Sequence, residues 1–277
     1  MSVLKQELII EPGSTARYFW RDLFSYRELF LVFAWRDISV RYKQTVIGLL
    51  WAVIRPFLTM VVFTVIFGSL ANLPSEAGAP YAILVFSALL PWNLFSTSLA
   101  DAGNSLVSNS SFITKVYFPR LIIPAAAIVT ALVDFLISLF ILFGLMIWYQ
   151  YVPSWQIVFL PLFTVMAAFA ALGPGLYLAT MTAKYRDFRI IIPFALQFGL
   201  YVSPVGFSAS VIPEKWRLLY DLNPLVGVIE GFRWCILGGE TPFNWAAFTI
   251  SAVVIASMTW LGLRQFKGAM SKLADFI

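Results

Sequence analysis

Six long apolar stretches limit what this chain can fold into more strongly than any other feature of its sequence. Each approaches the ~20 residues that a helix needs to cross the ~30 Å hydrocarbon layer of a bilayer. They occupy about 47–70, 81–99, 121–149, 157–181, 190–207 and 245–263. Only 12% of the residues are charged, against about 25% in a soluble domain. The sequence therefore predicts an all-α integral membrane protein with six transmembrane helices.

Lysine and arginine are distributed unevenly among the segments that connect these stretches. All but four of the 19 lie before the first stretch or after the second, fourth or sixth. The exceptions are Lys215, Arg217 and Arg233 in the alternate connections and Arg55 inside the first stretch. Because basic residues are enriched in cytoplasmic connections, we expect both termini to lie in the cytoplasm.

The predicted spans and their orientation divide the chain into three parts. Residues 1–46 form a cytoplasmic N-terminus, 47–264 the six-span transmembrane domain, and 265–277 a cytoplasmic tail. If residues 20–41 are helical, polar and apolar side chains fall on opposite arcs, which predicts an amphipathic helix in the interface plane. The polar arc holds Arg21, Ser25, Glu28, Arg36 and Ser39, and the apolar arc Leu23, Phe30, Ala34 and Ile38. Such a helix is either a membrane anchor or a lever that rests on a cytoplasmic partner.

The segment 203–244, between the fifth and sixth spans, is too apolar for an ordinary loop. It is also too interrupted to be one crossing helix. The interruptions are Pro204, Pro213, Pro224 and the pair Gly238 and Gly239. Short re-entrant helices in the outer leaflet fit best, packed where protein satisfies their backbone. Glu230 and Arg233 stand at i and i+3, so we expect them to pair on one helical face.

The residue types present argue against an enzyme. The chain has no histidine and a single cysteine, Cys235, and its fourteen acidic residues are scattered. A membrane-bound glycosyl- or phosphotransferase would need a base or a cluster of acidic metal ligands near the interface. An ion-coupled transporter of small molecules would usually show two repeated halves, and the sequence shows no internal repeat. The G-x-x-x-x-G-K-[ST] phosphate loop of nucleotide-binding proteins is also absent.

Two segments on the predicted cytoplasmic side, 108–120 and 183–189, mix aromatic and basic residues beside a span. They are either docking points for a partner or interfacial belts of amphipathic side chains. Two charges lie inside spans, where a charge costs about 2.5 to 3.5 kcal/mol at the helix centre on insertion scales. We expect Arg55 to face water, substrate or a partner, and Asp134 to snorkel or to bond to neighbouring helices.

Two stripes of side chains follow helical spacing. Phe194, Phe198 and Tyr201 stand at i, i+4 and i+7 in the fifth span. The first span has a mixed face of Trp51, Arg55, Thr59 and Phe63. Ordinary packing between helices and the lining of a substrate path are both compatible with such stripes.

Five separated motifs, in order, make the chain similar to one family. They resemble the permease subunit of bacterial ABC transporters that export cell-surface polysaccharides. Within that family the chain is most similar to O-antigen (lipopolysaccharide) export permeases, with capsule and teichoic-acid export permeases as relatives. The resemblance runs from about residue 18 to 265. The motifs are RYKQTVIGLLWAVIRP at 41–56, LLPWNLF at 89–95, NSLVSNSSFITKVYFPRLIIP at 104–124, YRDF at 185–188 and LNPLVGVIEGFRW at 222–234.

The resemblance implies a homodimer in the bacterial inner membrane, joined to two copies of a separate ABC ATP-binding subunit. ATP and Mg would bind to that partner, and this chain would hold no cofactor and bind no nucleic acid. The implied substrate is a lipid-linked polysaccharide on an undecaprenyl diphosphate anchor, moved from the cytoplasmic to the periplasmic side. Capsular polysaccharide and teichoic acid remain alternative cargoes.

The resemblance also implies roles for particular residues. Contact with the ATP-binding subunit is expected at Phe112, Ile113, Thr114, Lys115, Val116 and Tyr117, and to a lesser degree at Tyr185, Arg186, Asp187 and Phe188. The substrate entrance is expected at Arg36, Arg41, Lys43, Val46, Ile47 and Gly48. Positive-inside topology alone also accounts for these cations. Spans one and five line the pore in the family, which assigns both stripes to it.

Overall fold

A computed structural model describes residues 24–43, 46–76, 78–116, 118–238 and 243–270. The described part is helical, with no strand in it. The first half contains α2 (Arg27–Tyr42), α3 (Val46–Phe63), a π-helical turn η2 (Thr64–Leu70), α4 (Tyr81–Ser108), α5 (Ser110–Ile113) and α6 (Ile122–Trp148). The second half contains η3 (Trp155–Phe159), α7 (Leu160–Lys184), α8 (Phe188–Val202), η4 (Ala209–Val211), α9 (Glu214–Asp221), α10 (Pro224–Leu237) and α11 (Trp245–Ala269). The predicted all-α class is confirmed for these residues.

Five segments of the described chain are long and apolar enough to cross a membrane: α3 continued by η2, α4, α6, α7 with η3, and α11. They correspond to five of the six predicted spans. The remaining one is α8, which has 15 residues. At 1.5 Å per residue it is about 22 Å long, shorter than the ~30 Å hydrocarbon layer. Helix length therefore supports five spans and leaves the sixth a prediction.

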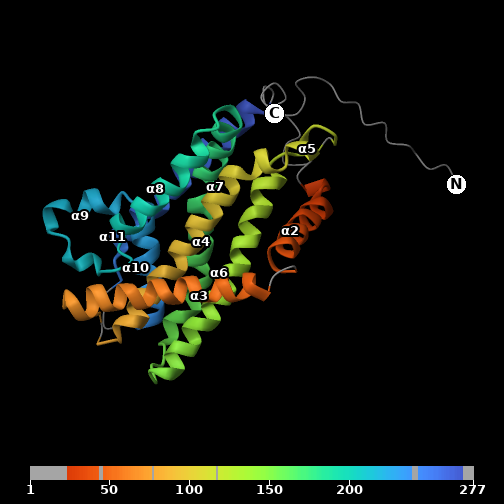
Figure 1. Ribbon diagram of the computed structural model, residues 1–277. Coiled ribbons are helices and arrows are strands. Elements are labelled where there is room, and N and C mark those ends of the chain that lie inside the picture. The colour runs from red at the N-terminus through yellow and green to blue at the C-terminus, as the bar shows by residue number, and fades with distance from the viewer. Residues whose placement is uncertain (1–23, 44–45, 77, 117, 239–242, 271–277) are drawn as a thin grey trace.

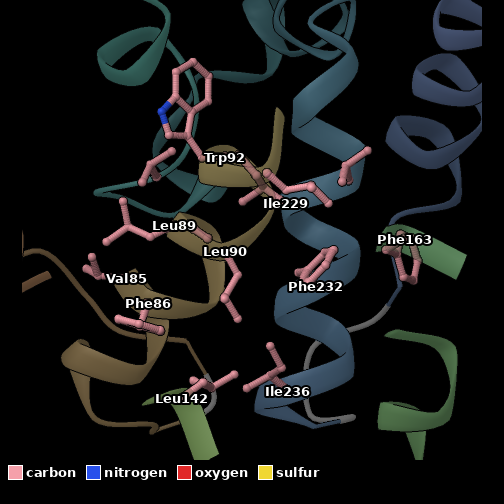
Figure 2. Packing of buried hydrophobic residues seen from close by; sticks show 14 of the residues in the cluster. Val85, Phe86, Leu89, Leu90, Trp92, Leu142, Phe163, Ile229, Phe232 and Ile236 are labelled. Carbon is pink, nitrogen blue, oxygen red and sulfur yellow. The ribbon is translucent and has the colours of Figure 1, made fainter. Parts of the chain in front are cut away.

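The helix α4 lies at the centre of the bundle. In its most apolar window 78% of the residues are buried, against 44% or less in each of the other four segments. It packs against α6, α7 and α10, while α11 covers α7 (Figure 1). Figure 2 shows Leu90 of α4 between that helix and Phe232 of α10, and both residues belong to the main apolar core, as does Phe86. A helix that is apolar on all sides is buried in this way.

The helices α7 and α11 approach each other at two glycines. A Cβ on Gly173 would lie 2.4 Å from the carbonyl oxygen of Met258, and one on Gly262 would lie 2.2 Å from that of Gly173. Small residues at such crossings let the backbones of membrane helices pack closely. This contact fixes α11 against α7, next to the core built on α4.

The helix α3 is attached loosely to the rest of the chain. Only 17% of the residues in its most apolar window are buried. In Figure 1 it runs across α4 and α6 and does not lie along them. Most of its apolar surface is therefore not covered by this chain.

The segment between α8 and α11 is broken into η4, α9 and α10, as the proline and glycine positions predicted. The predicted ion pair between Glu230 and Arg233 is wrong. Glu230 accepts a hydrogen bond from the Asn244 amide at 2.9 Å, and Arg233 lies 3.7 Å from Glu76. Each side chain contacts a partner that is distant in sequence. A rule for neighbours at i and i+3 on one helix does not include such partners.

Candidate functional site

The segment predicted to contact an ATP-binding subunit follows directly after α4. It consists of Asn109, the short helix α5 and residues 114–116. Ile113 is buried, whereas Phe112, Thr114, Lys115 and Val116 are exposed. Tyr117 lies outside the described residues. Hereafter residues 109–116 are called the coupling segment.

A shallow pocket of about 200 Å³ lies on this segment. It is lined by Ile113, Thr114, Lys115, Val116, Phe118 and Arg120. Arg120 donates a hydrogen bond to the carbonyl of Met270 at the end of α11, at 3.0 Å. The side chains predicted to dock a partner therefore border a surface depression. The residues that follow them are connected to the end of α11 by the hydrogen bond of Arg120.

The second predicted contact is the turn between α7 and α8. Tyr185, Arg186 and Asp187 are exposed, and Phe188 is half-buried at the start of α8. Figure 1 places this turn and α5 at the same end of the bundle, where α11 also ends. The structure thus brings the two predicted contacts to one face, although 68 residues separate Tyr117 from Tyr185 in the sequence.

The helix α2 holds the coupling segment through Arg36. The guanidinium of Arg36 donates a hydrogen bond to Oδ1 of Asn109 at 2.7 Å. It also lies over the rings of Phe33, 4.6 Å from the centroid, and Phe112, 5.3 Å from the centroid. Cations over aromatic faces are attracted by the ring quadrupole. Hereafter Phe33, Arg36, Asn109 and Phe112 are called the Arg36 cluster.

The outward side of α2 is apolar. Leu31, Val32, Trp35 and Val40 are each more than 60% exposed. Phe33 and Ala34 are buried, and α2 packs along α6. The sequence predicted a helix with a polar face, and the structure shows that Arg36 on that face is turned toward polar groups of the protein. Whether α2 lies in the interface plane stays a prediction.

Arg41, near the end of α2, joins three helices. Its guanidinium donates to Asp101 of α4 and to Asp134 of α6, each at 2.6 Å. The hydroxyl of Tyr42 also donates to Asp134. Burial alone would lower the pKa of Arg41, but the two carboxylates outweigh it and raise that pKa. Hereafter Arg41, Tyr42, Asp101 and Asp134 are called the Arg41 cluster.

Tyr42 and Arg41 keep their protons over the physiological pH range. Burial, together with the hydrogen bond to Asp134, raises the pKa of the Tyr42 hydroxyl above its usual value. The Arg41 cluster therefore contains one fixed cation and one fixed hydrogen-bond donor facing two carboxyl groups. The expectation that Asp134 bonds to a neighbouring helix is confirmed, because both of its oxygens bond to side chains of α2.

The predicted substrate entrance is only partly described. Arg36 and Arg41 are engaged by side chains of the same chain, and Lys43 is exposed. Val46, Ile47 and Gly48 form the first turn of α3, but their side chains lie outside the described residues. A role for these residues in binding an anionic substrate stays a prediction.

The two predicted pore stripes differ in exposure. Phe194, Phe198 and Tyr201 on α8 are 71%, 64% and 58% exposed. On α3, Trp51 and Arg55 are exposed and Thr59 is half-buried. Arg55 is therefore not enclosed by this chain, and its contact with water, substrate or a partner stays a prediction.

The stripes meet at one end. Phe63, at the end of α3, is buried, and its ring lies 6.4 Å from that of Tyr201. Phe63 also packs edge-on against Phe67 at 5.5 Å. The remaining stripe residues of α8 present an uncovered aromatic face. Their assignment to a pore stays a prediction.

Asp101 is the residue of this site that the sequence reasoning missed. The apolar pattern ended the second span at residue 99, whereas α4 continues to Ser108. Asp101 is accommodated in that extension because Arg41 pairs with it. The available signal was a carboxylate just beyond an apolar stretch in a chain with an arginine-rich helix before its first span.

Comparison with known proteins assigns the chain to a family. The sequence profile of the ABC-2 type transporter matches residues 28–237. The O-antigen export system permease protein RfbA of Myxococcus xanthus is 26% identical over 261 residues, which cover 93% of this chain and 98% of that protein. A protein of the same name from Klebsiella pneumoniae is 25% identical over 252 residues, 90% of this chain and 95% of its own.

A further relative has a more general name. The inner membrane transport permease YadH of Escherichia coli K12 is 25% identical over 235 residues, which cover 79% of this chain and 89% of that protein. The region matched by the family profile runs from the second residue of α2 to the end of α10 and includes the coupling segment. The chain therefore belongs to the ABC-2 type transporter family, and it is a transport permease rather than an enzyme.

Proposed function

We propose that this chain is the membrane subunit of an ATP-driven exporter of lipid-linked polysaccharide. The observation that carries the proposal is the similarity to an O-antigen export permease over 93% of the chain. The exporter moves a glycan on an undecaprenyl diphosphate anchor from the cytoplasmic to the periplasmic side of the inner membrane. Two copies of the chain assemble with two copies of an ABC ATP-binding subunit.

Two open surfaces support the homodimer. The helix α3 is mostly uncovered by this chain, and α8 has one buried residue, Ile192. In the proposed dimer these helices from both copies surround the path of the glycan. The aromatic rings along α8 suit a sugar chain that slides through the path. Sugars stack on such rings favourably, and stacking does not fix the sugar chain at one position along the helix.

The coupling segment and the α7–α8 turn face the cytoplasm in this proposal. Both form the contact with the ATP-binding subunit, and both termini lie on the same side. The helix α8 with the residues that follow it makes the sixth crossing, and α9 and α10 re-enter the outer leaflet. The proline-broken chain between α8 and α10, with its paired backbone, supports this arrangement.

When the two ATP-binding subunits bind nucleotide, they close on each other, and this closure supplies the driving force for export. A ligand shifts a conformational equilibrium only through interactions that differ between the two states. The exposed side chains of the coupling segment are the groups that would make such interactions with the ATP-binding subunit.

The proposal is tested in the bacterium that carries this chain. Its gene is replaced by one encoding a non-functional variant, and surface glycan and intracellular lipid-linked glycan are both measured. Loss of one surface polysaccharide with accumulation of its lipid-linked form inside the cell is expected. The sugar composition of that glycan distinguishes O-antigen from capsule or teichoic acid. Unchanged surface glycans would contradict the proposal.

A further inference from the structure

Aromatic rings from four segments of the chain form one connected group. Neighbouring ring centroids lie 4.8 to 6.5 Å apart, within the range in which aromatic pairs attract each other. The helix α11 begins in this group and ends beside the coupling segment, so the group lies at the opposite end of the bundle (Figure 1). Hereafter it is called the ring network. Its members are Trp155 and Phe159 of η3, Phe163 of α7, Trp234 of α10, Phe243 just before α11, and Trp245 and Phe248 of α11.

The ring network holds α10 in place. This helix has 14 residues and is about 21 Å long, too short to cross the ~30 Å hydrocarbon layer. A side chain at Gly231 would overlap the ring of Phe163, so α10 packs directly on that ring. Figure 2 shows Phe163 beside α10, on the side away from α4. The ring of Trp234 lies 6.5 Å from that of Trp155 and 4.9 Å from that of Phe243.

One side of the ring network is uncovered by this chain. Trp155 and Trp245 are 69% and 71% exposed, whereas Phe163 is buried. The sequence contains no charged residue from 135 to 183, which includes the whole connection between α6 and α7, or from 241 to 263. Tryptophan has an apolar body and one N–H donor, and it is enriched where hydrocarbon meets water. The exposed side of the network therefore suits the boundary of a bilayer.

The length of α11 agrees with this placement. Arg264, near its other end, lies over the ring of Trp260 at 5.4 Å from the centroid. Long cationic side chains near helix ends reach the headgroup layer while their stems lie along apolar surface. Trp245 and Arg264 are 19 residues apart, which is about 29 Å of helix. This length matches the ~30 Å hydrocarbon layer, so one headgroup layer at Arg264 places the other at Trp245.

We propose that the ring network is an anchor in the headgroup layer of the outer leaflet, and that it fixes the depth of α10. Its partner is phospholipid. The indole N–H groups of Trp155 and Trp245 donate to ester or phosphate oxygens, and the ring faces lie against the upper part of the acyl chains. The inference goes beyond the proposed function and rests on it only for which of the two leaflets is the outer one.

The experiment measures the depth of the two exposed rings by fluorescence quenching in the complete complex. The complex is placed in nanodiscs whose phospholipid is brominated either near the headgroup or near the chain end. The wild type is compared with Trp155→Phe combined with Trp245→Phe, which keeps a ring at both positions. The difference between their emissions is the signal of the two tryptophans. Trp92→Phe, at a buried position of α4, gives the control signal.

We expect bromine near the headgroup to quench the signal of the two tryptophans about twofold or more over bromine near the chain end, because tryptophan sits at headgroup level. The Trp92 signal should respond to neither lipid. Stronger quenching by the deeper bromine would overturn the anchor. So would quenching by acrylamide in water with none by either lipid, or protection from acrylamide by a soluble polysaccharide fragment, since the rings would then face water or bind sugar. A complex that does not export glycan would contradict the proposed function and leave this quenching unchanged.

A second measurement separates an anchor from ordinary packing between helices. Trp155→Ala combined with Trp245→Ala removes both exposed rings, and its melting temperature is compared with that of the wild type in nanodiscs and in detergent. An anchor predicts a larger downward shift in nanodiscs, because only a bilayer has an oriented headgroup layer. Equal shifts in the two media would overturn the anchor. If the alanine variant does not fold, the quenching of the phenylalanine variant decides the question.

Discussion

The guanidinium of Arg233 on α10 donates a hydrogen bond to the carbonyl of Phe207, in the turn after α8, at 2.9 Å. It also donates to the carbonyl of Val205 at 3.3 Å. The hydroxyl of Tyr81, at the start of α4, donates to the carbonyl of Gly206 between them, at 2.7 Å. The carbonyls of three consecutive residues thus accept hydrogen bonds from side chains of α4 and α10. A fully buried arginine fixes the turn that follows α8.

Replacing Arg233 should therefore destabilise the fold. In Arg233→Met, the carbonyls of Val205 and Phe207 lose their donor and Glu76 loses its cation. We expect a loss of about 3 kcal/mol, as is typical when one partner of a buried pair is removed. Thermal unfolding of the detergent-solubilised chain measures it. Lys215→Met, an exposed cation on α9, is the control, and equal melting temperatures for the two variants would contradict the account.

The glycine contact between α7 and α11 gives a second prediction. In Gly262→Ala the new methyl group would collide with the Gly173 carbonyl, so α11 must shift away from α7. Overpacking of this kind costs about 1 to 3 kcal/mol. Gly268→Ala, on the same helix with no atom within 4 Å of its Cβ, is the matched control. Both melting temperatures are measured, and a Gly262→Ala variant as stable as its control would show that the close approach is not maintained.

The aromatic face of α8 gives a third prediction. Replacing Phe194, Phe198 and Tyr201 by alanine together should lower glycan export while basal ATP hydrolysis by the complex persists. These rings are more than half exposed, so their removal leaves most of the core intact, although Tyr201 also lies 6.4 Å from the ring of the buried Phe63. Phe140→Ala with Trp148→Ala removes equally exposed rings from α6 as a control. Normal surface glycan in the α8 variant would exclude these rings from the path.

The coupling segment gives a fourth prediction. Lys115→Ala combined with Val116→Ala removes two exposed side chains from the border of the pocket. We expect membrane insertion to be normal and the amount of ATP-binding subunit that copurifies to fall severalfold. The control is Lys215→Ala with Leu218→Ala, two exposed residues of α9. Full recovery of the partner with the first variant would place the contact elsewhere.

Periodicity and composition predicted most of the helical architecture. Five apolar stretches became helices of spanning length because each contains enough consecutive apolar residues. The stretch at 190–207 was only partly helical, since α8 ends at Val202 and Pro204 follows. The end of the second span was placed too early because Asp101 and Asn104 interrupt the apolar pattern. Pairing with Arg41 lets α4 continue through them.

Partners distant in sequence could not be predicted. The sequence did not anticipate that the guanidinium of Arg41 contacts Asp101 and Asp134, 60 and 93 residues away, and its place at a substrate entrance stays a prediction. Arg233 was assigned to Glu230 on its own helix, yet it contacts Glu76. Local spacing rules describe one helix, whereas a buried arginine selects whichever carboxylates and carbonyls the tertiary fold brings near it.

The central claim is that the coupling segment faces the cytoplasm, where an ATP-binding subunit acts on it. The most direct measurement is labelling of Lys115→Cys in a Cys235→Ser background with a maleimide that does not cross membranes. Val152→Cys, exposed beyond the opposite end of α6, is the control for the other side. The account predicts that spheroplasts label position 152 only, whereas inside-out vesicles stripped of the ATP-binding subunit label position 115. Labelling of position 115 in intact spheroplasts would contradict it.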